Sequence, residues 1–182
     1  MVIVPRMADE ANVDESSVCR LDSEPKPVEP CSIVIFGASG DLTARKLIPA
    51  LYHLHVENQL PEPFRIIGFA RRDKTDDSWR EELKEAFQQY SRSKSVDGEK
   101  WRAFAANIVY CQGEFTDPAA YAKLGQQLAS FGHPKLQHNL LFYLATSPSQ
   151  FAEVVDGCHS AGLLHRDKGG PHWQRGVVEK PF

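Results

Sequence analysis

The segment Ser32-Ile33-Val34-Ile35-Phe36-Gly37-Ala38-Ser39-Gly40-Asp41-Leu42 carries the strongest structural signal in this chain. A short apolar run that ends at a glycine is typical of a strand buried on both faces of a parallel sheet. Gly37 and Gly40 allow the chain to turn tightly into a helix and let a ligand approach the backbone. Because the N–H groups at a helix start favour phosphate, the segment predicts a dinucleotide site. A strand, turn and helix without a ligand is the alternative.

The glycine turn departs from the common dinucleotide fingerprint G-x-G-x-x-G, since Ser39 and Leu42 stand where its second and third glycines would be. A P-loop is excluded, because no Gly-Lys-Ser or Gly-Lys-Thr follows the turn. The identity of the ligand therefore has to come from residues outside this turn.

The composition excludes several other classes of protein. With 182 residues the chain is long enough for one domain with a sizeable core. A net charge of −3 with mixed signs argues against nucleic-acid binding, and no apolar run reaches the length of about 18 residues that a membrane helix needs. Charged residues interrupt the start of the chain, which argues against a signal peptide. We expect a cytoplasmic protein with reduced cysteines, at positions Cys19, Cys31, Cys111 and Cys158.

Two regions differ in composition. Residues 1–30 are rich in proline and acidic residues and end in Glu24-Pro25-Lys26-Pro27-Val28-Glu29-Pro30, which predicts a disordered leader. Residues 31–182 alternate between strand-like and helix-like patterns, which predicts an α/β fold, a Rossmann-like coenzyme domain built on a doubly wound parallel sheet. The expected strands are 32–36, 64–70, 108–111, 140–145 and 177–179, and the expected helices are 43–57, 77–91, 99–106, 118–131 and 150–161.

Local patterns support these helices. Leu47, Leu51 and Leu54 recur at helical spacing and predict one buried stripe on the first helix. Asp117 followed by Pro118 predicts an N-cap and the first turn of the fourth helix.

The end of the second strand points to the cofactor. The sequence there reads Gly68-Phe69-Ala70-Arg71-Arg72-Asp73. In a Rossmann-like fold this position meets the adenosine ribose, where an acid suits the 2′-hydroxyl of NAD and an arginine suits the 2′-phosphate of NADP. Arg71 and Arg72 favour NADP, because guanidinium groups match phosphate oxygens. NAD stays an alternative, because the Asp73 carboxylate could instead accept a hydrogen bond from a free ribose 2′-hydroxyl.

Four motifs follow one another along the chain: Gly37-Ala38-Ser39-Gly40-Asp41-Leu42-Thr43-Ala44-Arg45-Lys46-Leu47, Gly68-Phe69-Ala70-Arg71, Phe142-Tyr143-Leu144-Ala145 and Glu179-Lys180-Pro181-Phe182. In this order they resemble the coenzyme domain of the glucose-6-phosphate dehydrogenase family, over residues 31–182. The resemblance implies oxidation of glucose 6-phosphate to 6-phosphogluconolactone with hydride transfer to NADP, the first step of the pentose phosphate pathway. It also implies a homo-oligomer in the complete enzyme.

The resemblance assigns roles to individual residues. The loop from Gly37 to Ala44 would surround the pyrophosphate, and Ser39, Arg71 and Arg72 would lie near the 2′-phosphate. Lys46 and Lys180 would lie between the coenzyme and the sugar phosphate, with a cis bond between Lys180 and Pro181. Glu114 and Phe115 would lie on the adenine side. The coenzyme-binding residues implied in this way are Gly37, Ala38, Ser39, Gly40, Asp41, Leu42, Thr43, Ala44, Arg71, Arg72, Glu114, Phe115, Phe151 and Lys180.

The catalytic histidine of the family lies in an R-I-D-H-Y-L-G-K segment beyond the E-K-P-F motif. None of the seven histidines of this chain has that context. We therefore expect no catalytic residue here, no turnover by this chain alone, and no substrate-binding and oligomer-forming domain. No histidine or cysteine spacing predicts a metal site. Two alternatives stay open: a non-catalytic NADP-binding module, and another sugar dehydrogenase with an E-K-P motif.

Overall fold

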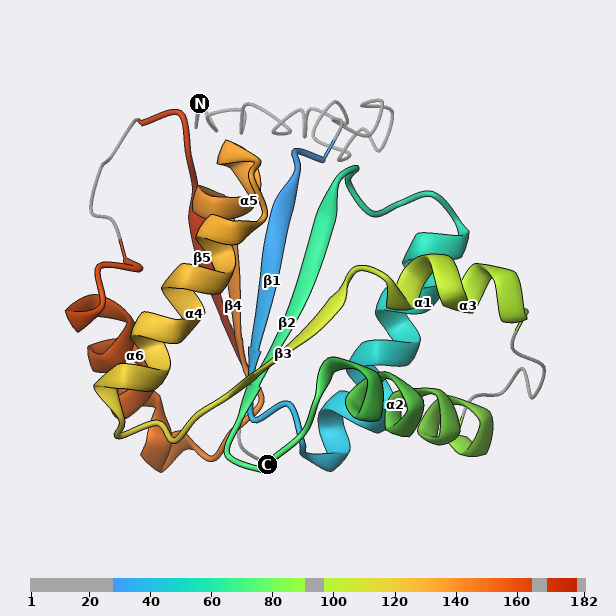
Figure 1. Ribbon diagram of the computed structural model, residues 1–182, viewed down its shortest axis with the longest axis horizontal. Helices are drawn as coiled ribbons and strands as arrows, with labels where there is room; N and C mark the ends of the chain where they lie inside the picture. Colours follow the sequence, from blue (N-terminus) through green and yellow to red (C-terminus); the bar gives the residue numbers. More distant parts are fainter. Residues whose placement is uncertain (1–27, 91–96, 165–169, 180–182) are drawn as a thin grey trace, which may run out of the picture.

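The computed structural model describes residues 28–90, 97–164 and 170–179 of the chain. A five-stranded sheet, parallel throughout, forms its centre, with the strand order β3-β2-β1-β4-β5 (Figure 1). This order confirms the predicted α/β fold with a doubly wound parallel sheet. The strands are β1 (Cys31–Phe36), β2 (Phe64–Ala70), β3 (Ile108–Gln112), β4 (Leu140–Leu144) and β5 (Gln174–Val178).

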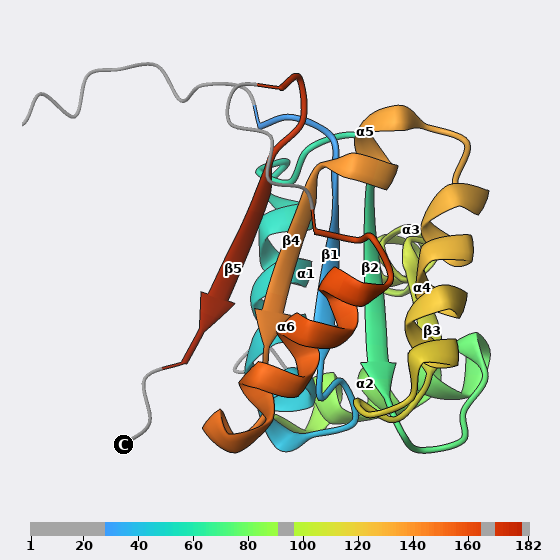
Figure 2. The same ribbon diagram turned by 90° about the vertical axis from the view of Figure 1, so that its left-hand side faces the viewer.

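Helices cover both faces of the sheet (Figures 1 and 2). The first face is packed by the π-helix η2 (Thr43–Leu47), α1 (Ile48–Val56), α2 (Asp76–Tyr90) and α3 (Gly98–Ala105), and the second by α4 (Pro118–Ser130) and α6 (Phe151–Ser160). Two short elements, α5 (Pro134–His138) and the 3-10 helix η3 (Pro148–Gln150), were not predicted. None of the described helices is both long and apolar enough to cross a membrane.

β1 runs between two hydrophobic cores. All six of its residues are buried, with exposed fractions of 5% or less. Ile33 faces the core beneath α1, α2 and α3, whereas Val34 faces the core beneath α4 and α6. Ser32 satisfies its buried hydroxyl by donating to the carbonyl oxygen of Leu136 in α5 at 2.6 Å. The uninterrupted apolar run in the sequence therefore reflects a strand that is buried on both faces.

The helix after the glycine turn packs the predicted leucines only partly into the core. Leu47, Leu51 and Leu54 are half-buried, and Leu47 and Leu51 pack against the core, so the predicted stripe is confirmed in part. Ile48 and Tyr52, which follow Leu47 and Leu51, are buried more deeply. The helix starts with a π turn, in which the N–H of Ile48 donates to the carbonyl oxygen of Thr43. Pro49 follows this turn and has no N–H to donate, and the widened turn accommodates its ring.

Aspartate side chains cap two helices. Asp117 accepts a hydrogen bond from the N–H of Ala119 at 2.9 Å, which confirms the predicted N-cap of α4. Asp97 caps α3 by accepting from the N–H groups of Glu99 and Lys100 at 2.9 and 3.2 Å. These bonds satisfy backbone donors that a helix leaves free at its start.

The predicted leader lies outside the described residues except for residues 28–30. There the Glu29 carboxylate accepts a hydrogen bond from Lys135 at 2.9 Å and another from the indole N–H of Trp173 at 3.1 Å. The hydrogen bond from Lys135 is the main cause that lowers the pKa of Glu29. Glu29 thus links the residues before β1 to α5 and to the start of β5.

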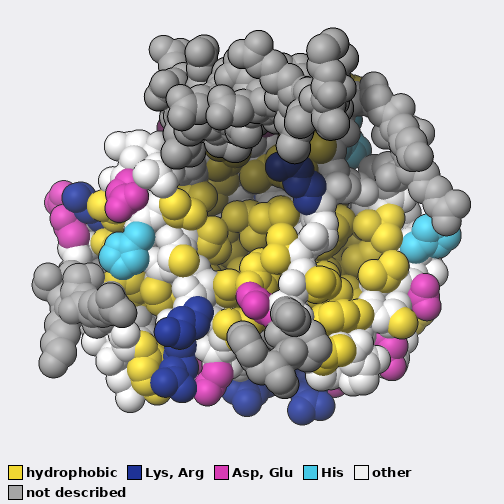
Figure 3. All heavy atoms as spheres, turned by 180° about the vertical axis from the view of Figure 1, so that it is seen from behind, with side chains coloured by type: hydrophobic (Ala, Val, Ile, Leu, Met, Phe, Trp, Pro, Cys, Tyr) yellow, Lys and Arg dark blue, Asp and Glu magenta, His cyan; other side chains and the backbone are white. Residues whose placement is uncertain are grey.

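Helices leave the sheet partly uncovered at β4 and β5, on the face that packs against α1. Figure 3 shows hydrophobic side chains gathered in a hollow on the α1 side of the molecule. Leu141 and Tyr143 of β4 are half-buried on this side, and Val177 of β5 lies beside Tyr143 in the strand register. β5 forms the edge of the sheet, and its Val178 is 58% exposed.

The glycine in the middle of β2 is explained by a tryptophan that covers it. A Cβ atom at Gly68 would lie 2.1 Å from Cη2 of Trp79 in α2, well inside van der Waals contact. The Trp79 ring is fully buried and packs with its centre 5.3 Å from that of Tyr110 in β3. The ring therefore has no space into which it can retreat.

We predict that Gly68→Ala lowers the free energy of unfolding by about 1–3 kcal/mol, because the added methyl group overpacks the contact with Trp79. Gly98→Ala is the matched control, since nothing lies within 4 Å of a Cβ at that position. Thermal unfolding followed by circular dichroism measures both. Equal melting temperatures for the two variants would contradict this packing.

Three cysteines of the described residues are free and buried: Cys31, Cys111 and Cys158. Burial raises the pKa of Cys31 and of Cys111 to about 11 and that of Cys158 to about 12. The thiolate form that reacts with electrophiles is therefore disfavoured in the folded protein.

We predict that iodoacetamide modifies these three thiols at least about 100-fold more slowly in the folded chain than in urea, because a rise of two pKa units lowers the thiolate fraction by that factor. Peptide mass spectrometry after timed quenching gives the rate at each cysteine. Modification of the native protein at the unfolded rate would show that the thiols are accessible.

Candidate functional site

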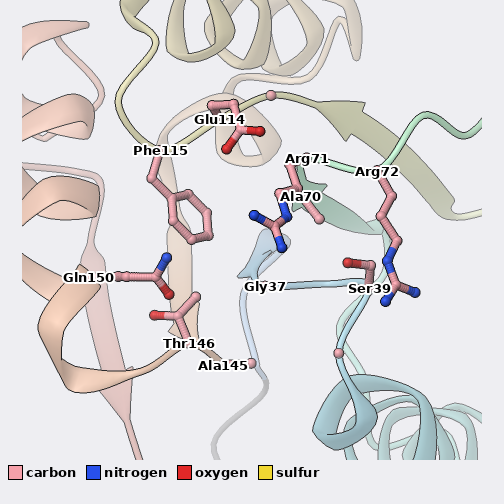
Figure 4. A pocket seen from close by; sticks show the side chains of 12 residues that line it. Gly37, Ser39, Ala70, Arg71, Arg72, Glu114, Phe115, Ala145, Thr146 and Gln150 are labelled. Carbon is pink, nitrogen blue, oxygen red and sulfur yellow. The ribbon is translucent and has the colours of Figure 1, made fainter.

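A pocket of about 310 Å³ opens at the carboxyl edge of the sheet (Figure 4). The connections that follow β1 and β4 leave toward opposite faces of the sheet, so a crevice forms where these neighbouring strands end. Segments that follow four strands line it: Gly37, Ser39, Gly40, Ala70, Arg71, Arg72, Gly113, Glu114, Phe115, Ala145, Thr146 and Gln150.

Gly37 allows the strand ends to come close together. Its φ is +83°, and a Cβ there would lie 2.5 Å from the carbonyl oxygen of Ala145. Its N–H donates to the carbonyl oxygen of Phe69 at 3.0 Å, and the N–H of Ala145 donates to that of Phe36 at 2.9 Å. The turn is therefore tied to both neighbouring strands, and only glycine fits it without strain.

The predicted loop from Gly37 to Ala44 lines the pocket only in part. Gly37, Ser39 and Gly40 line it, whereas Ala38 and Thr43 are buried. Asp41 is exposed, and Leu42 and Ala44 are half-buried at the start of the helix. Backbone N–H groups in a first helical turn have no partner within the helix and can bind an anion.

Arg71 and Arg72 lie on the loop after β2, and both are exposed at the pocket. Figure 4 shows Arg72 beside Ser39 and Arg71 nearer the middle of the pocket. Asp73, the residue that left NAD open, is exposed and is not among the lining residues. Together with Glu114 the arginines are the charged side chains of the lining, which gives this pocket a net positive charge.

Glu114 and Phe115 follow β3 and form another wall of the pocket. The Phe115 ring stacks on that of Phe69 with 6.0 Å between centres and 17° between planes. The hydroxyl of Tyr121 donates to the carbonyl oxygen of Phe115 at 2.9 Å, which fixes its backbone. A rigid aromatic wall of this kind suits a flat ring such as a purine base.

Two polar residues of the lining were not predicted. Thr146 and Gln150 follow β4 and lie beside Phe115 in Figure 4. Phe151, the predicted aromatic, is half-buried against the core beneath α4 and α6. Ala70, Gly113 and Ala145 were also missed. Their positions could have indicated them, since Ala70 is the last residue of β2, and Gly113 and Ala145 directly follow β3 and β4.

The two lysines predicted at the sugar phosphate are not part of this lining. Lys46 is exposed on the π turn, and Lys180 with its bond to Pro181 lies outside the described residues. Glu179, the residue before Lys180, accepts a hydrogen bond from the hydroxyl of Tyr143. Burial and this carboxylate raise the pKa of Tyr143 to about 12, so its hydroxyl stays a donor at neutral pH.

Metal ligands do not gather in the described part of the chain. No group of three or more histidine, cysteine, aspartate or glutamate side chains there has the arrangement to hold a metal ion. The chemistry of the pocket is that of backbone N–H groups, two guanidinium groups and an aromatic wall.

Comparisons with known proteins agree on one family. The family model described as "Glucose-6-phosphate dehydrogenase, NAD binding domain" matches residues 34–182. The glucose-6-phosphate 1-dehydrogenase of Chlamydia pneumoniae is 40% identical over 174 residues, which are 94% of this chain and 33% of that protein. That of Chlamydia muridarum is 41% identical over 155 residues, which are 84% of this chain and 31% of that protein.

Solved structures give the same result. The glucose-6-phosphate 1-dehydrogenase of Mycobacterium avium superposes with a TM-score of 0.68 and 32% identity, over 83% of this chain and 30% of the other. A glucose-6-phosphate dehydrogenase in complex with its substrate glucose 6-phosphate gives a TM-score of 0.73 and 31% identity, over 88% and 32% of the two chains. The chain spans about a third of the length of the relatives it matches. It belongs to the glucose-6-phosphate dehydrogenase family, and its residues 34–182 correspond to the NAD-binding domain of that family.

Proposed function

We propose that this chain is the NADP-binding part of a glucose-6-phosphate dehydrogenase of the cytoplasm. The complete enzyme would oxidise glucose 6-phosphate to 6-phosphogluconolactone. The observation that carries the choice of NADP is the pair of guanidinium groups, Arg71 and Arg72, that follow β2 at the edge of the pocket. In this fold that position meets the adenosine ribose, where a 2′-phosphate distinguishes NADP from NAD.

The residues of the pocket fit such a dinucleotide. Gly37, Ser39 and Gly40 line the pocket beside the first turn of the helix, where the pyrophosphate would lie. Arg71, Arg72 and Ser39 would hold the 2′-phosphate, and Glu114 with Phe115 would enclose the adenine. The bound nicotinamide supplies the hydride acceptor, and the protein supplies its position.

The substrate assignment rests on the family. One matching structure is described as holding glucose 6-phosphate. In this chain Lys46 and Lys180 are the residues proposed to meet the sugar phosphate, since an ammonium group attracts a phosphate dianion. The family's homo-oligomer is likewise proposed for the complete enzyme only.

We predict that Arg71→Ala weakens NADP binding by about 10-fold to 100-fold, because hydrogen bonds to a charged phosphate contribute about 1.5–3 kcal/mol. The affinity for NAD is expected to change by less than about threefold, because NAD has no 2′-phosphate and Arg71 can make only an uncharged contact with it. Calorimetric titration with both coenzymes measures this. Arg102→Ala is the matched control, because Arg102 is exposed on α3 and does not line the pocket. Equal affinities of the unmodified chain for NADP and NAD would exclude the 2′-phosphate role.

We predict that the purified 182-residue chain binds NADP but forms no NADPH when glucose 6-phosphate is added. The reason is that none of its histidines lies in the segment that carries the family's general base. Absorbance of NADPH over time measures turnover, and a complete relative from the family serves as positive control. Sustained NADPH formation by this chain would place the base within these residues.

A further inference from the structure

The loop that carries the two arginines rests on a buried tyrosine of the neighbouring strand. Tyr110 of β3 is 6% exposed. Its hydroxyl donates to the carbonyl oxygen of Arg72 at 2.7 Å and lies 3.2 Å from that of Ala70. Along the chain Arg71 lies between Ala70 and Arg72. The Tyr110 hydroxyl therefore contacts the backbone on both sides of the residue proposed to meet the 2′-phosphate.

The other end of the same loop is held to β3 as well. The carboxylate of Asp76, the first residue of α2, accepts a hydrogen bond from the backbone N–H of Tyr110 at 2.6 Å. Arg80 lies 3.6 Å from Asp76 and donates to the carbonyl oxygen of Ile108 from two nitrogens, at 2.9 and 2.6 Å. The loop 71–75 is therefore clamped to β3 before and after the arginines.

The ring of Tyr110 is itself fixed. The buried Trp79 packs against it with 5.3 Å between ring centres, and the close fit of Trp79 on Gly68 holds the indole in place. Burial raises the pKa of the Tyr110 hydroxyl, so this group keeps its proton and remains a donor at neutral pH.

We propose that Tyr110, together with Asp76, is a positioning residue for NADP selectivity: it holds the backbone of the loop so that Arg71 stands ready at the pocket. This inference rests on the proposed function, in which Arg71 meets the 2′-phosphate. A guanidinium on a fixed backbone loses less conformational freedom when it binds than one on a mobile loop. The benefit applies to NADP and not to NAD, because NAD has no group for Arg71 to hold.

The test compares the two coenzymes in calorimetric titrations. Tyr110→Phe removes the hydroxyl and leaves the ring, and we expect it to weaken NADP binding by about fivefold to tenfold, the usual effect of one lost hydrogen bond. NAD binding should change less than twofold, on the order of experimental error for a group that NAD does not use. Tyr52→Phe is the matched control, since it removes a hydroxyl from a buried tyrosine of α1 that does not contact the loop through any described hydrogen bond.

A double variant separates positioning from general stabilisation. In the Arg71→Ala background, Tyr110→Phe should cause no further loss of NADP affinity, because the group that it positions is gone. An equal loss in both backgrounds would overturn the proposal, and so would an unchanged ratio of NADP to NAD affinity in Tyr110→Phe. If Tyr110→Phe does not fold, Asp76→Ala is measured in its place. An unchanged ratio of NADP to NAD affinity in Asp76→Ala would then overturn the proposal. Equal binding of both coenzymes by the unmodified chain would instead remove the proposed NADP function.

Discussion

The close approach of Gly37 to the carbonyl oxygen of Ala145 constrains the whole carboxyl edge of the sheet. Any side chain at Gly37 would meet that oxygen at 2.5 Å, so the ends of β1 and β4 can be adjacent only if this residue has none. Their connections then leave to opposite faces of the sheet, and the pocket lies between them. Burial of every residue of β1 gives this arrangement its rigidity, because a strand packed on both faces cannot shift its register without exposing apolar groups.

Much of the fold could be predicted from the sequence, because its strands are short apolar runs and its helices carry end signals such as Asp117. α5 was missed because five residues are too few to show a hydrophobic period. The predicted stripe of the first helix is only partly buried, since Ile48 and Tyr52 lie deeper than the leucines, and the π turn before Pro49 is not anticipated by a fixed helical period. β5 starts three residues earlier than predicted, since its first residues are polar and lie on the exposed edge.

The site could be predicted where it is local in sequence. Gly37, Ser39 and Arg71 belong to continuous motifs, and the structure brings them to one pocket. Thr146 and Gln150 could not be found in this way, because they reach the pocket only through the pairing of β4 with β1, about a hundred residues away in sequence. Phe115 was predicted from the family resemblance, but its stacking on Phe69 of another strand depends on the fold.

The edge position of β5 has a consequence for how this chain meets other molecules. Among the described residues β5 pairs with β4 on one side, and no strand of the sheet lies on its other side. Gly176 and Val178 are exposed on this strand and uncharged, whereas Arg175 is exposed and charged, and a charge on an edge strand discourages edge-to-edge pairing. The backbone of an edge strand can pair with one more strand. A short extended peptide of matching register would be a reagent for capping it.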